Sequence, residues 1–529
     1  MLDRLKLARR VDQIIVCTST NPQDDPLIEL AEAEGVASFR GDEDDVVKRL
    51  SDAATAFNLD YILSITADCP FSDPEYADRI VEAYLETNAD LIRALTLPLG
   101  AFSYGVKPEA FRKIVEIKDQ TNSEVWGRYF TDTDLFEVYD LPIENELHRQ
   151  PNLRMTLDYP ADLEFFKAVF AALYRPGEVF TFDEILRFLR DHPEVVAINR
   201  DCAAGYQKRW LSQSSIKLKA RYEVKRAVVI GCDSIGQRHI RNLRRLGITD
   251  IFELRTGQEL SGLEADVAIV SNPTSVHLET IERCLPHVRG VFIEKPLAAS
   301  LEGVDEILKQ IRQRRVVSFV GYNLQFHPVV KELQKFLADG AVGKPLLFQC
   351  LAGHPDLGGS VLLTLIDEIH LAMELLGEAD KVACMLPSSD ALADIMINHS
   401  SNAVSQIHLD MIQRPTHRRG VISCERGWIS YNLVTNTVIG QTMGQHGVKV
   451  IADDALYDVN ESYVEEMEMF LNCVREGKVR HEYDAVRAMQ SLAIATSALE
   501  AAHTNSLIEI PAWVNSNVWL GNSRPGKSS

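Results

Sequence analysis

The sequence predicts an α/β protein built from two modules. Two series of short apolar strands alternate with helical stretches, one in residues 1–207 and the other starting at residue 225. Alternation of this kind is typical of βαβ units, in which the strands lie parallel. After about residue 340 the pattern changes to longer runs of alternating apolar and polar residues. Such runs predict an antiparallel sheet with one packed face and one solvated face.

In the first module, the helix over 26–35 should end at Gly35, and the helix over 180–193 should begin at Thr181 or Asp183. The full set of expected elements is strands at 12–18, 36–41, 61–70 and 89–96, with helices at 26–35, 44–57, 73–86 and 180–193. Residues 208–224 are basic and only weakly periodic, so we expect a linker there.

The second module divides at the change of pattern, so we expect one domain over 225–338, another over 339–515 and a disordered tail over 516–529. The expected parallel strands are 225–231, 249–256, 265–272, 290–295 and 316–323, and the expected antiparallel runs are 401–413, 420–434 and 447–452. Helices are expected over 237–247, 461–477 and 485–503.

Composition excludes several classes of function. The chain has 529 residues, of which 46% are hydrophobic and 25% charged, which is ordinary for a globular protein. The net charge of −21, most of it within residues 1–210, argues against nucleic acid or an anionic membrane as partner. No uninterrupted apolar stretch approaches about 18 residues, so we expect no membrane span. Nine scattered cysteines without a Cys-x-x-Cys pair indicate reduced thiols and a cytoplasmic protein.

A glycine-containing turn joins the first strand of the second module to its helix. The strand runs into Gly231, and Gly236 lies at the helix start, which is the context of a dinucleotide-binding fingerprint. The backbone N–H groups of Ser234 and Ile235 would then hold a pyrophosphate at the helix N-terminus. The middle glycine of that fingerprint is replaced by Asp233. A bare strand–helix turn is therefore the alternative.

The end of the second strand bears on the choice of cofactor. Arg255 and Thr256 stand where an acidic residue would bind a ribose hydroxyl, which favours a 2′-phosphate. Glu253 lies nearby, so both NAD and NADP stay open as the cofactor.

The next three strands end in polar residues at the edge of the sheet where ligands bind. These ends are SNPTSVH with Ser271, Asn272, Pro273 and His277, then Glu294-Lys295-Pro296, then GYNLQFHP with Tyr322, Asn323 and His327. Together with the glycine turn, the ordered series resembles the Gfo/Idh/MocA family of NAD(P)-dependent sugar oxidoreductases over about residues 225–510. The resemblance implies a Rossmann domain followed by an α/β domain with an open antiparallel sheet.

The resemblance also implies roles for these residues. Lys295 matches the family's active-site lysine, whose ammonium would stabilise charge on the substrate oxygen. Glu294 and the end of the SNP strand match cofactor-binding positions. His277, Tyr322, Asn323 and His327 match positions that line the nicotinamide and substrate cleft.

The last family motif departs from the usual pattern. In DLGGSVLLTLIDEIHLAMELLG, Gly358 and Gly359 match the family. Thr364 occupies the family's aspartate position, Asp367 its catalytic histidine position, and His370 its later aspartate position. On a helix Asp367 and His370 would share one face and could exchange a proton with a substrate hydroxyl. An ordinary solvated pair is the alternative.

Residues 1–205 resemble the cytidylyltransferases that make CMP-activated acidic sugars, of the spore-coat polysaccharide and acylneuraminate type. The motifs are FRGDEDDVVKRL, ILSITADCPFSDP and NLRMTLDYPADLEF. The resemblance implies a Rossmann-like nucleotidyltransferase sheet, with Asp68 and Asp158 holding Mg²⁺. It also implies sugar or base contacts at Arg40, Asp44, Asp45 and Arg49. The family's opening Gly-rich phosphate loop is missing, so we expect this module to be impaired unless the true start lies upstream.

We therefore expect an NAD(P)-dependent oxidoreductase acting on a sugar or sugar nucleotide in surface-polysaccharide or nonulosonate biosynthesis. Lys295, Asp367 and His370 would carry its chemistry. Two alternatives stay open: a non-catalytic scaffold that retains both folds, and a bifunctional enzyme with an active nucleotidyltransferase. We expect a small-molecule substrate and a homo-oligomer, with neither nucleic acid nor membrane as partner.

Overall fold

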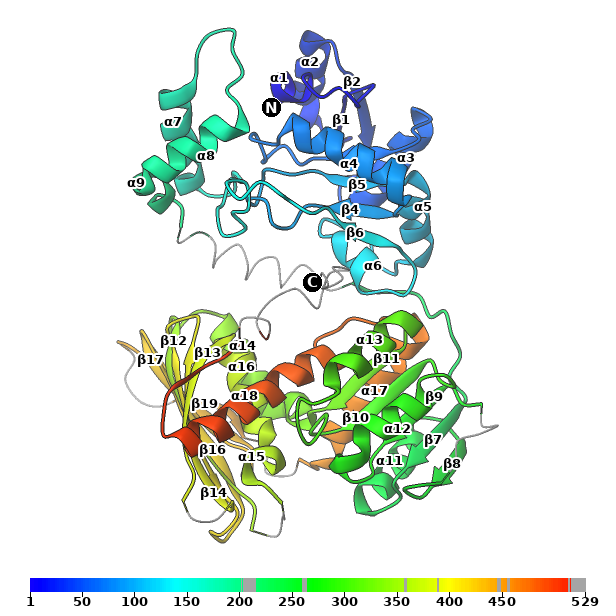
Figure 1. Ribbon diagram of the computed structural model, residues 1–529, viewed down its shortest axis with the longest axis vertical. Helices are drawn as coiled ribbons and strands as arrows, with labels where there is room; N and C mark the ends of the chain where they lie inside the picture. Colours follow the sequence, from blue (N-terminus) through cyan, green and yellow to red (C-terminus); the bar gives the residue numbers. More distant parts are fainter. Residues whose placement is uncertain are drawn as a thin grey trace, which may run out of the picture. The chain divides into compact units, whose positions relative to one another are not determined.

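The computed structural model describes residues 1–200, 202, 216–258, 264–355, 359–387, 390–444, 449–453, 457–511 and 514. The chain forms two compact α/β units, residues 1–219 and 220–517 (Figure 1). The predicted fold class is confirmed. Among the described helices, none has the length and apolar character needed to cross a bilayer. All nine cysteines are free thiols, as expected.

The first unit contains short strands and amphipathic helices. Its main elements are β1 (Ile15–Ser19), α2 (Asp25–Glu34), β2 (Ala37–Gly41), α3 (Val46–Ala56), β3 (Ile62–Ser64), α4 (Pro74–Thr87), β4 (Leu91–Arg93), β5 (Tyr104–Val106), α5 (Pro108–Ile117), α6 (Gly127–Thr131), β6 (Val138–Asp140), α7 (Pro160–Leu173), α8 (Phe182–Asp191) and α9 (Pro193–Ala197). The short α1 (Leu2–Leu5) and the 3-10 turn η1 (Pro22–Asp24) complete the set.

The strands of the first unit form two sheets. β1 and β2 pair in parallel, and a separate four-stranded sheet has the order β3-β5-β4-β6. β5 runs antiparallel to both β3 and β4, which corrects the expectation of parallel strands throughout. The strand has three residues, within the segment GAFSYGVKPEA, and three residues are too few to show a periodicity.

Local capping explains where the helices begin and end. Gly35 closes α2 in the left-handed conformation, with φ of 66°, as the sequence predicts. Thr181 opens α8 by accepting from the backbone N–H of Glu184, whose carboxylate accepts from Thr181 in return. Asp73 caps α4 by accepting from the backbone N–H groups of Glu75 and Tyr76.

The four-stranded sheet of the first unit has an apolar cluster on each face. Successive residues of a strand point to opposite faces, and Leu91 and Ile92 belong to different clusters. Ile216 and Leu218, within the predicted linker, are buried in the cluster of Leu91. The segment 216–219 is therefore packed structure, while residues 208–215 of that linker lie outside the described residues.

The second unit begins with the predicted parallel sheet. Its first elements are β7 (Arg226–Ile230), α11 (Ser234–Arg245), β8 (Asp250–Leu254), β9 (Val267–Val270), η2 (Thr274–Val276), α12 (His277–Cys284), β10 (Gly290–Glu294), α13 (Val304–Arg314), β11 (Val317–Gly321), η3 (Asn323–Phe326) and α14 (Pro328–Ala338). The five strands pair in parallel in the order β11-β10-β9-β7-β8. This arrangement is a Rossmann-type sheet.

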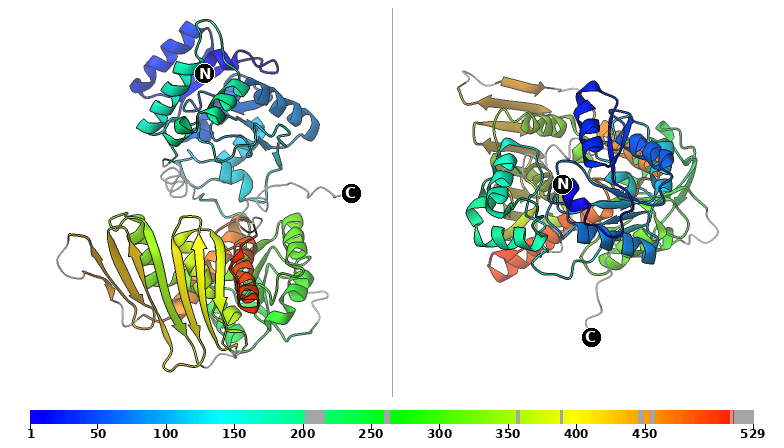
Figure 2. Two further views of the ribbon diagram at one scale, coloured as in Figure 1. Left: turned by 60° about the vertical axis from the view of Figure 1, so that its left-hand side comes forward. Right: turned by 90° about the horizontal axis from the view of Figure 1, so that it is seen from above.

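A nine-stranded sheet follows. The remaining elements are β12 (Pro345–Gly353), α15 (Val361–Thr364), α16 (Ile366–Leu376), β13 (Ala379–Met385), β14 (Leu392–His399), β15 (Val404–Asp410), β16 (His417–Cys424), β17 (Gly427–Asn432), β18 (Thr437–Thr442), β19 (Lys449–Asp453), α17 (Asn460–Glu476), α18 (Ala485–Thr504) and β20 (Ile508–Glu509). The strand order is β19-β18-β17-β16-β12-β15-β14-β13-β20. The left view of Figure 2 shows the strands of this sheet side by side in one broad layer. β12 and β15 pair in parallel, so the sheet is antiparallel except at that pair.

Helix α17 follows the nine-stranded sheet in sequence but packs under the Rossmann sheet. Phe470 of α17 contacts Phe292 of β10 and Phe319 of β11, with ring centroids 5.7 and 5.9 Å apart. The helix thus adds side chains from residues 460–476 to the edge of the Rossmann sheet where β10 and β11 end. The predicted tail over 516–529 lies outside the described residues.

Candidate active site

The turn after β7 leaves no room for side chains at its two glycines. Gly231 has φ of +92°, and a Cβ there would lie 2.4 Å from the backbone nitrogen of Asn272. A Cβ on Gly236 would lie 1.9 Å from the carbonyl oxygen of Gly231. Both positions therefore require glycine, and the close approach brings the start of α11 against the strand ends.

The N-terminus of α11 is open. Asp233 is the N-cap residue and is exposed, but its side chain makes no capping hydrogen bond. Ser234 is exposed and Ile235 is partly buried. The first N–H groups of a helix lack intrahelical partners and attract anions. The turn can therefore bind a phosphate, with the Asp233 carboxylate as an unfavourable neighbour.

At the end of β8, Glu253 and Arg255 take different directions. Glu253 turns to α11, where it accepts from Gln237 at 3.3 Å and pairs with Arg244 at 3.6 Å. Arg255 and Thr256 are exposed beyond the strand, and the backbone N–H of Arg255 donates to Gln258. A cation is thus available beside the glycine turn.

The predicted cofactor residues after β9 mainly hold backbone segments together. Ser271 Oγ donates to the carbonyl of Gly231 at 2.7 Å, and Asn272 Nδ2 donates to Thr280 Oγ1 at 2.8 Å. The ring nitrogens of His277 lie 2.8 and 3.0 Å from the carbonyl oxygens of Asn272 and Pro296. Burial lowers the pKa of His277.

His277 is 1% exposed, and its ring ties the end of β9 to the segment after β10. That it also lines the cleft, as the family resemblance implies, stays a prediction. Pro273, in contrast, is exposed at the strand end.

Lys295 directly follows β10, and its side chain contacts the carboxylate of Asp367 on α16. Its Nζ lies 3.0 Å from Asp367 Oδ2 and donates to the carbonyl of Thr364 at 2.9 Å. Lys295 is 23% exposed, whereas Asp367 is 2% exposed. Lys295 therefore faces both solvent and Asp367, as a group that polarises a substrate oxygen must.

Arg418 of β16 extends this pair into a row of four alternating charges. It donates through Nη2 to Asp367 at 3.1 Å, and through Nε and Nη2 to the two oxygens of Glu368 at 2.7 and 3.1 Å. Burial opposes ionisation of Asp367, but Lys295 and Arg418 outweigh it and hold the pKa of Asp367 below its usual value. Burial raises the pKa of Glu368.

His370 does not pair with Asp367, although both lie on α16. Its Nδ1 lies 2.9 Å from Ser491 Oγ, and its ring stacks on Tyr322 with centroids 3.9 Å apart. It is 1% exposed, and burial lowers the pKa of His370 to about 4. The predicted proton-exchanging pair is therefore corrected: Asp367 faces Lys295 and Arg418, and His370 faces the core.

The three predicted cleft residues that follow β11, Tyr322, Asn323 and His327, are buried. Tyr322 is covered by His370, and Asn323 Nδ2 donates to Ser462 Oγ of α17 at 3.2 Å. His327 caps α14 by accepting from the N–H of Val329 at 3.3 Å. Burial lowers the pKa of His327 to about 4. Each of the three side chains thus contacts other protein groups, and their role in lining the cleft stays a prediction.

Three charged side chains of this region were not predicted from the sequence: Arg418, Glu368 and Glu466. Arg418 lies in a strand where its neighbour Arg419 has the same charge, so no pattern marks it. Glu368 follows Asp367 within one helix and reads as a solvated acid. Glu466 of α17 interrupts a mostly apolar helix face and is 1% exposed. That interruption is the one signal in the sequence that could have identified it.

In the first unit, Asp68 and Asp158 belong to neighbouring segments. The backbone N–H of Leu157 donates to the carbonyl of Asp68 at 2.8 Å. Asp158 accepts from Arg154 at 2.6 Å and Thr156 at 2.8 Å, whereas Asp68 accepts from the Cys69 thiol at 3.5 Å. Burial, together with Asp68 and more weakly Asp158, raises the pKa of Cys69 to about 12. No group of three or more metal-ligating side chains occurs in the described part of the chain.

The predicted sugar or base contacts of the first unit bind other protein groups. Arg40 donates to the carbonyl oxygens of Ser19 and Asn21 at 3.0 and 2.7 Å and to the Asp25 carboxylate at 2.6 Å. Asp45 is buried and forms an ion pair with Lys118.

Arg49 donates to the carbonyl of Asp42 at 2.7 Å. Of the four predicted contacts, Asp44 is the one whose side chain is exposed.

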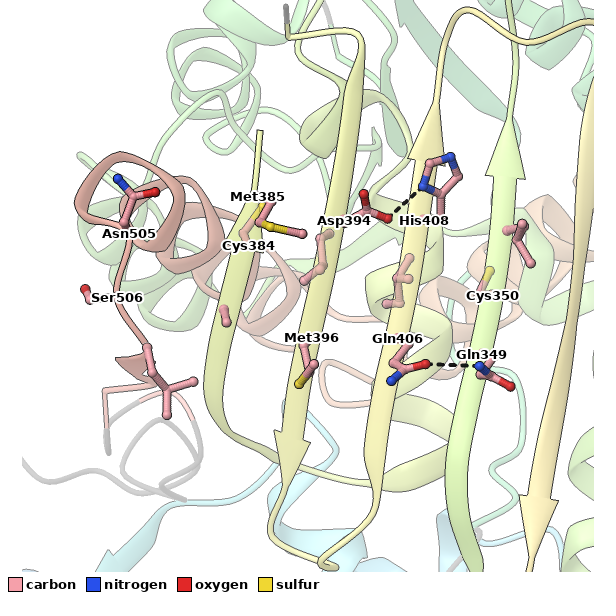
Figure 3. A pocket seen from close by; sticks show the side chains of 15 residues that line it. Gln349, Cys350, Cys384, Met385, Asp394, Met396, Gln406, His408, Asn505 and Ser506 are labelled. Carbon is pink, nitrogen blue, oxygen red and sulfur yellow. Dashed lines mark hydrogen bonds and ion pairs between the residues drawn. The ribbon is translucent and has the colours of Figure 1, made fainter. Parts of the chain in front are cut away.

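A shallow hollow of about 690 Å³ lies elsewhere, on the outer face of the nine-stranded sheet (Figure 3). Gln349 donates to Gln406 at 3.0 Å, and His408 pairs with Asp394 at 2.7 Å. These side chains alternate with buried residues that face α16, so the hollow is on the opposite face from Arg418. It is separate from the Lys295 site.

Comparison with known proteins identifies relatives of both units. Residues 248–322 match the oxidoreductase family with an NAD-binding Rossmann fold, and residues 1–191 match the cytidylyltransferase family. Myo-inositol 2-dehydrogenase of Thermotoga maritima is 25% identical over 299 residues, covering 47% of this chain and 88% of that protein. Spore coat polysaccharide biosynthesis protein SpsF of Bacillus subtilis is 27% identical over 186 residues, covering 35% of this chain and 77% of that protein.

One solved structure supports the fold of the second unit. Levoglucosan dehydrogenase in complex with NADH and levoglucosan superposes with a TM-score of 0.50 at 16% identity, covering 55% of this chain and 100% of that one. Both resemblances predicted from the sequence are confirmed.

Proposed function

Because the chain joins a cytidylyltransferase-family module to a module of the Gfo/Idh/MocA oxidoreductase family, we propose that it is an NAD(P)-dependent oxidoreductase acting on a sugar or sugar nucleotide. The observation that carries the proposal is the Lys295–Asp367 pair at the carboxyl end of β10. Ligands of parallel α/β sheets bind at that edge. The kinship of the first unit with a spore-coat polysaccharide protein supports a role in surface-polysaccharide or nonulosonate synthesis.

The residues of the glycine turn fit a dinucleotide. The missing side chains of Gly231 and Gly236 bring the uncapped start of α11 close to the strand ends, where its N–H groups would hold the pyrophosphate. Arg255 and Thr256 would hold the adenosine ribose, and a 2′-phosphate if the cofactor is NADP. When bound, the cofactor supplies a hydride acceptor or donor.

Lys295 and Asp367 then divide the remaining chemistry. The Lys295 ammonium donates to the substrate oxygen and stabilises its developing negative charge. Asp367 holds Lys295 in place and accepts or returns the hydroxyl proton. Arg418 and Glu368 fix the carboxylate of Asp367 from the other side.

The test is turnover by the full-length chain. A panel of sugars and sugar nucleotides is offered with NAD⁺ and NADP⁺, and reduction of the cofactor is followed by absorbance. We expect at least one substrate to be oxidised, and Lys295→Met to lose about 100-fold or more in rate. Lys309→Met, at an exposed lysine of α13, is the matched control. Equal rates for Lys295→Met and wild type would overturn the proposal.

Asp233 favours a second candidate, a non-catalytic scaffold that retains both folds. Its carboxylate stands where the family has glycine, at the N-cap of α11, and would face the pyrophosphate of a bound cofactor. Asp233→Gly separates the two candidates. An enzyme that uses its cofactor gains little affinity from the change, whereas a decayed site gains tenfold or more, about the worth of one removed charge clash.

A bifunctional enzyme is the third candidate. Mg²⁺ takes one or two carboxylates together with substrate phosphates, and Asp68 with Asp158 provides such a set. Arg154 already neutralises Asp158, which leaves Asp68 as the principal carboxylate for the ion. CMP-sugar formation from CTP, Mg²⁺ and an acidic sugar by the full chain, lost in Asp68→Asn, would establish this activity.

Three further expectations belong to the proposal. The free thiols suit the reducing cytoplasm. A small molecule rather than a polymer is the partner. The outer face of the nine-stranded sheet exposes Leu351, Met385 and Met396, which suits a homo-oligomer. The mass of the chain in solution tests the last point.

A further inference from the structure

Glu466 is a buried carboxyl group that no described cation neutralises by direct contact. It lies on α17 and is 1% exposed. Its Oε1 atom has no hydrogen-bond partner among the described residues. A buried polar group in this state usually has a functional or solvent-linked explanation, because leaving it unsatisfied costs stability.

The position of Glu466 is fixed by its neighbours. A Cβ built on Gly321, the last residue of β11, would lie 3.5 Å from Glu466 Oε1. Gly321 is the register partner of Glu294 at the end of β10, and Lys295 follows directly. Glu466 therefore lies at the carboxyl ends of β10 and β11, where the proposed function puts the reacting groups.

The groups that act on Glu466 come from several parts of the second unit. Glu294 of β10 and Asp367 of α16 are acidic, and Glu294 also bonds His239 of α11 at 2.5 Å. Lys295 opposes them. On the same helix, the ring of Tyr463 lies under the guanidinium of Arg238 of α11, whose Cζ is 4.4 Å from the ring centroid. Tyr483 is a further neighbour. Burial, reinforced by Glu294 and Asp367, raises the pKa of Glu466 well above its usual value.

Asp367 presents a second unsatisfied oxygen in the same region. Its Oδ2 binds Lys295 and Arg418, but its buried Oδ1 has no hydrogen-bond partner among the described residues. Asp367 thus faces Lys295 with one oxygen, and its other oxygen is free to pass a proton inward. Asp367 lies close enough to Glu466 to act on its carboxyl group electrostatically, and each of the two side chains has one buried oxygen without a hydrogen-bond partner among the described residues.

A nicotinamide ring changes charge when it reacts, since the oxidised ring carries one positive charge and the reduced ring none. In a site of low dielectric, a positive charge held close to a buried carboxyl group lowers the proton affinity of that group by about tenfold or more. Lys295 and Asp367 neutralise each other, so they respond weakly. Glu466 has no ion-pair partner among the described residues and responds strongly.

Resting on the proposed function, we propose that Glu466 gives up its proton when the oxidised cofactor binds and takes up the proton that the substrate hydroxyl loses during oxidation. The C–H bond of the substrate breaks, and the hydrogen leaves with its electron pair for the cofactor. The O–H proton passes to Asp367 and, by way of a bridging water, to the Glu466 carboxylate. Exchange of reduced for oxidised cofactor then releases this proton to solvent.

The decisive measurement is proton release on cofactor binding, without substrate. The full-length chain in weak buffer with an indicator dye is mixed with oxidised or reduced cofactor, NAD or NADP according to which one binds. We expect about one proton to be released per oxidised cofactor bound, and essentially none per reduced cofactor. Binding itself is followed separately by calorimetry.

Glu466→Gln keeps the size of the side chain but cannot ionise. We expect it to bind oxidised cofactor while proton release falls several-fold, and its turnover to lose the matching pH dependence. Glu468→Gln, an exposed glutamate on the same helix, is the control and should release protons as the wild type does. Equal release by Glu466→Gln and wild type would overturn the inference.

The wild-type chain alone gives a second test if Glu466→Gln does not fold. Affinity for oxidised cofactor should rise by up to tenfold per pH unit until Glu466 is ionised in the free protein, whereas affinity for reduced cofactor stays flat. Equal pH dependence for both forms contradicts the inference. If neither form binds, the proposed function itself fails, and this outcome is distinct from binding without proton release.

Discussion

Arg418→Met removes the cation that holds two buried carboxylates together. Arg418 donates three hydrogen bonds, two to Glu368 and one to Asp367, at 2.7 to 3.1 Å. Glu368 and Asp367 are each 2% exposed, so neither can turn to solvent when the guanidinium is gone. Methionine fills the space of the stem but supplies no charge.

The size of the effect follows from these contacts. Breaking a buried ion pair by removing one partner costs about 3–5 kcal/mol. Arg418 is 23% exposed, so water screens part of the interaction and the lower figure applies. A loss of about 3 kcal/mol corresponds to a decrease of about 6 °C in the melting temperature of a domain of this size.

The pH dependence of the stability loss shows that the buried Glu368 carboxylate causes it. Without Arg418, burial holds the folded-state pKa of Glu368 above its unfolded value. A carboxyl shifted in this direction destabilises the fold at pH values above its folded pKa and costs nothing below its unfolded pKa. The deficit of Arg418→Met should therefore shrink as pH falls toward about 4.

Scanning calorimetry of the full chain measures this deficit in the transition of residues 220–517. Arg419→Met changes the adjacent, exposed arginine and should leave that transition in place. A melting temperature for Arg418→Met that equals that of Arg419→Met would refute the reasoning. So would a deficit that grows as pH falls.

Three other changes have defined outcomes. Gly236→Ala puts a methyl group 1.9 Å from the Gly231 carbonyl and should abolish cofactor binding measured by calorimetry, whereas Gly127→Ala, with open space around it, should not. Thr181→Ala removes the capping box of α8 and should lower the unfolding free energy of the first unit by about 1 kcal/mol in urea titrations; no change would contradict the capping argument. His370 has a folded pKa of about 4, so between pH 6.5 and 4 a proton binds there in the unfolded chain only, and the stability of the fold decreases as pH falls through that range. His370→Gln should therefore flatten the plot of melting temperature against pH. An unchanged slope would contradict the burial argument.

The sequence predicted the elements whose signals are local. The strands beside Gly231 and Lys295 are short apolar runs that end in punctuating residues, and Gly35 and Thr181 act through the few residues next to them. Family resemblance supplied the location of Lys295 and Asp367. Both kinds of signal lie within a stretch of about 20 residues.

The missed features depend on contacts between distant segments. Arg418 meets Glu368 across 50 positions, and Ser491 meets His370 across 121. The three-residue spacing showed that Asp367 and His370 would share one face of a helix, but it could not show that Ser491 and Tyr322 hold His370 in the core. Strand β5 was missed because its three residues carry no periodicity, and its direction is set by pairing with β3 and β4.

Titration of the full-length chain with NADH and with NADPH, followed by nicotinamide fluorescence, tests the central claim most directly. The account predicts saturable binding of at least one of the two, lost in Gly236→Ala and retained in Lys295→Met, because the proposed function assigns the cofactor to the turn and the substrate to Lys295. Absence of binding at millimolar cofactor would contradict it.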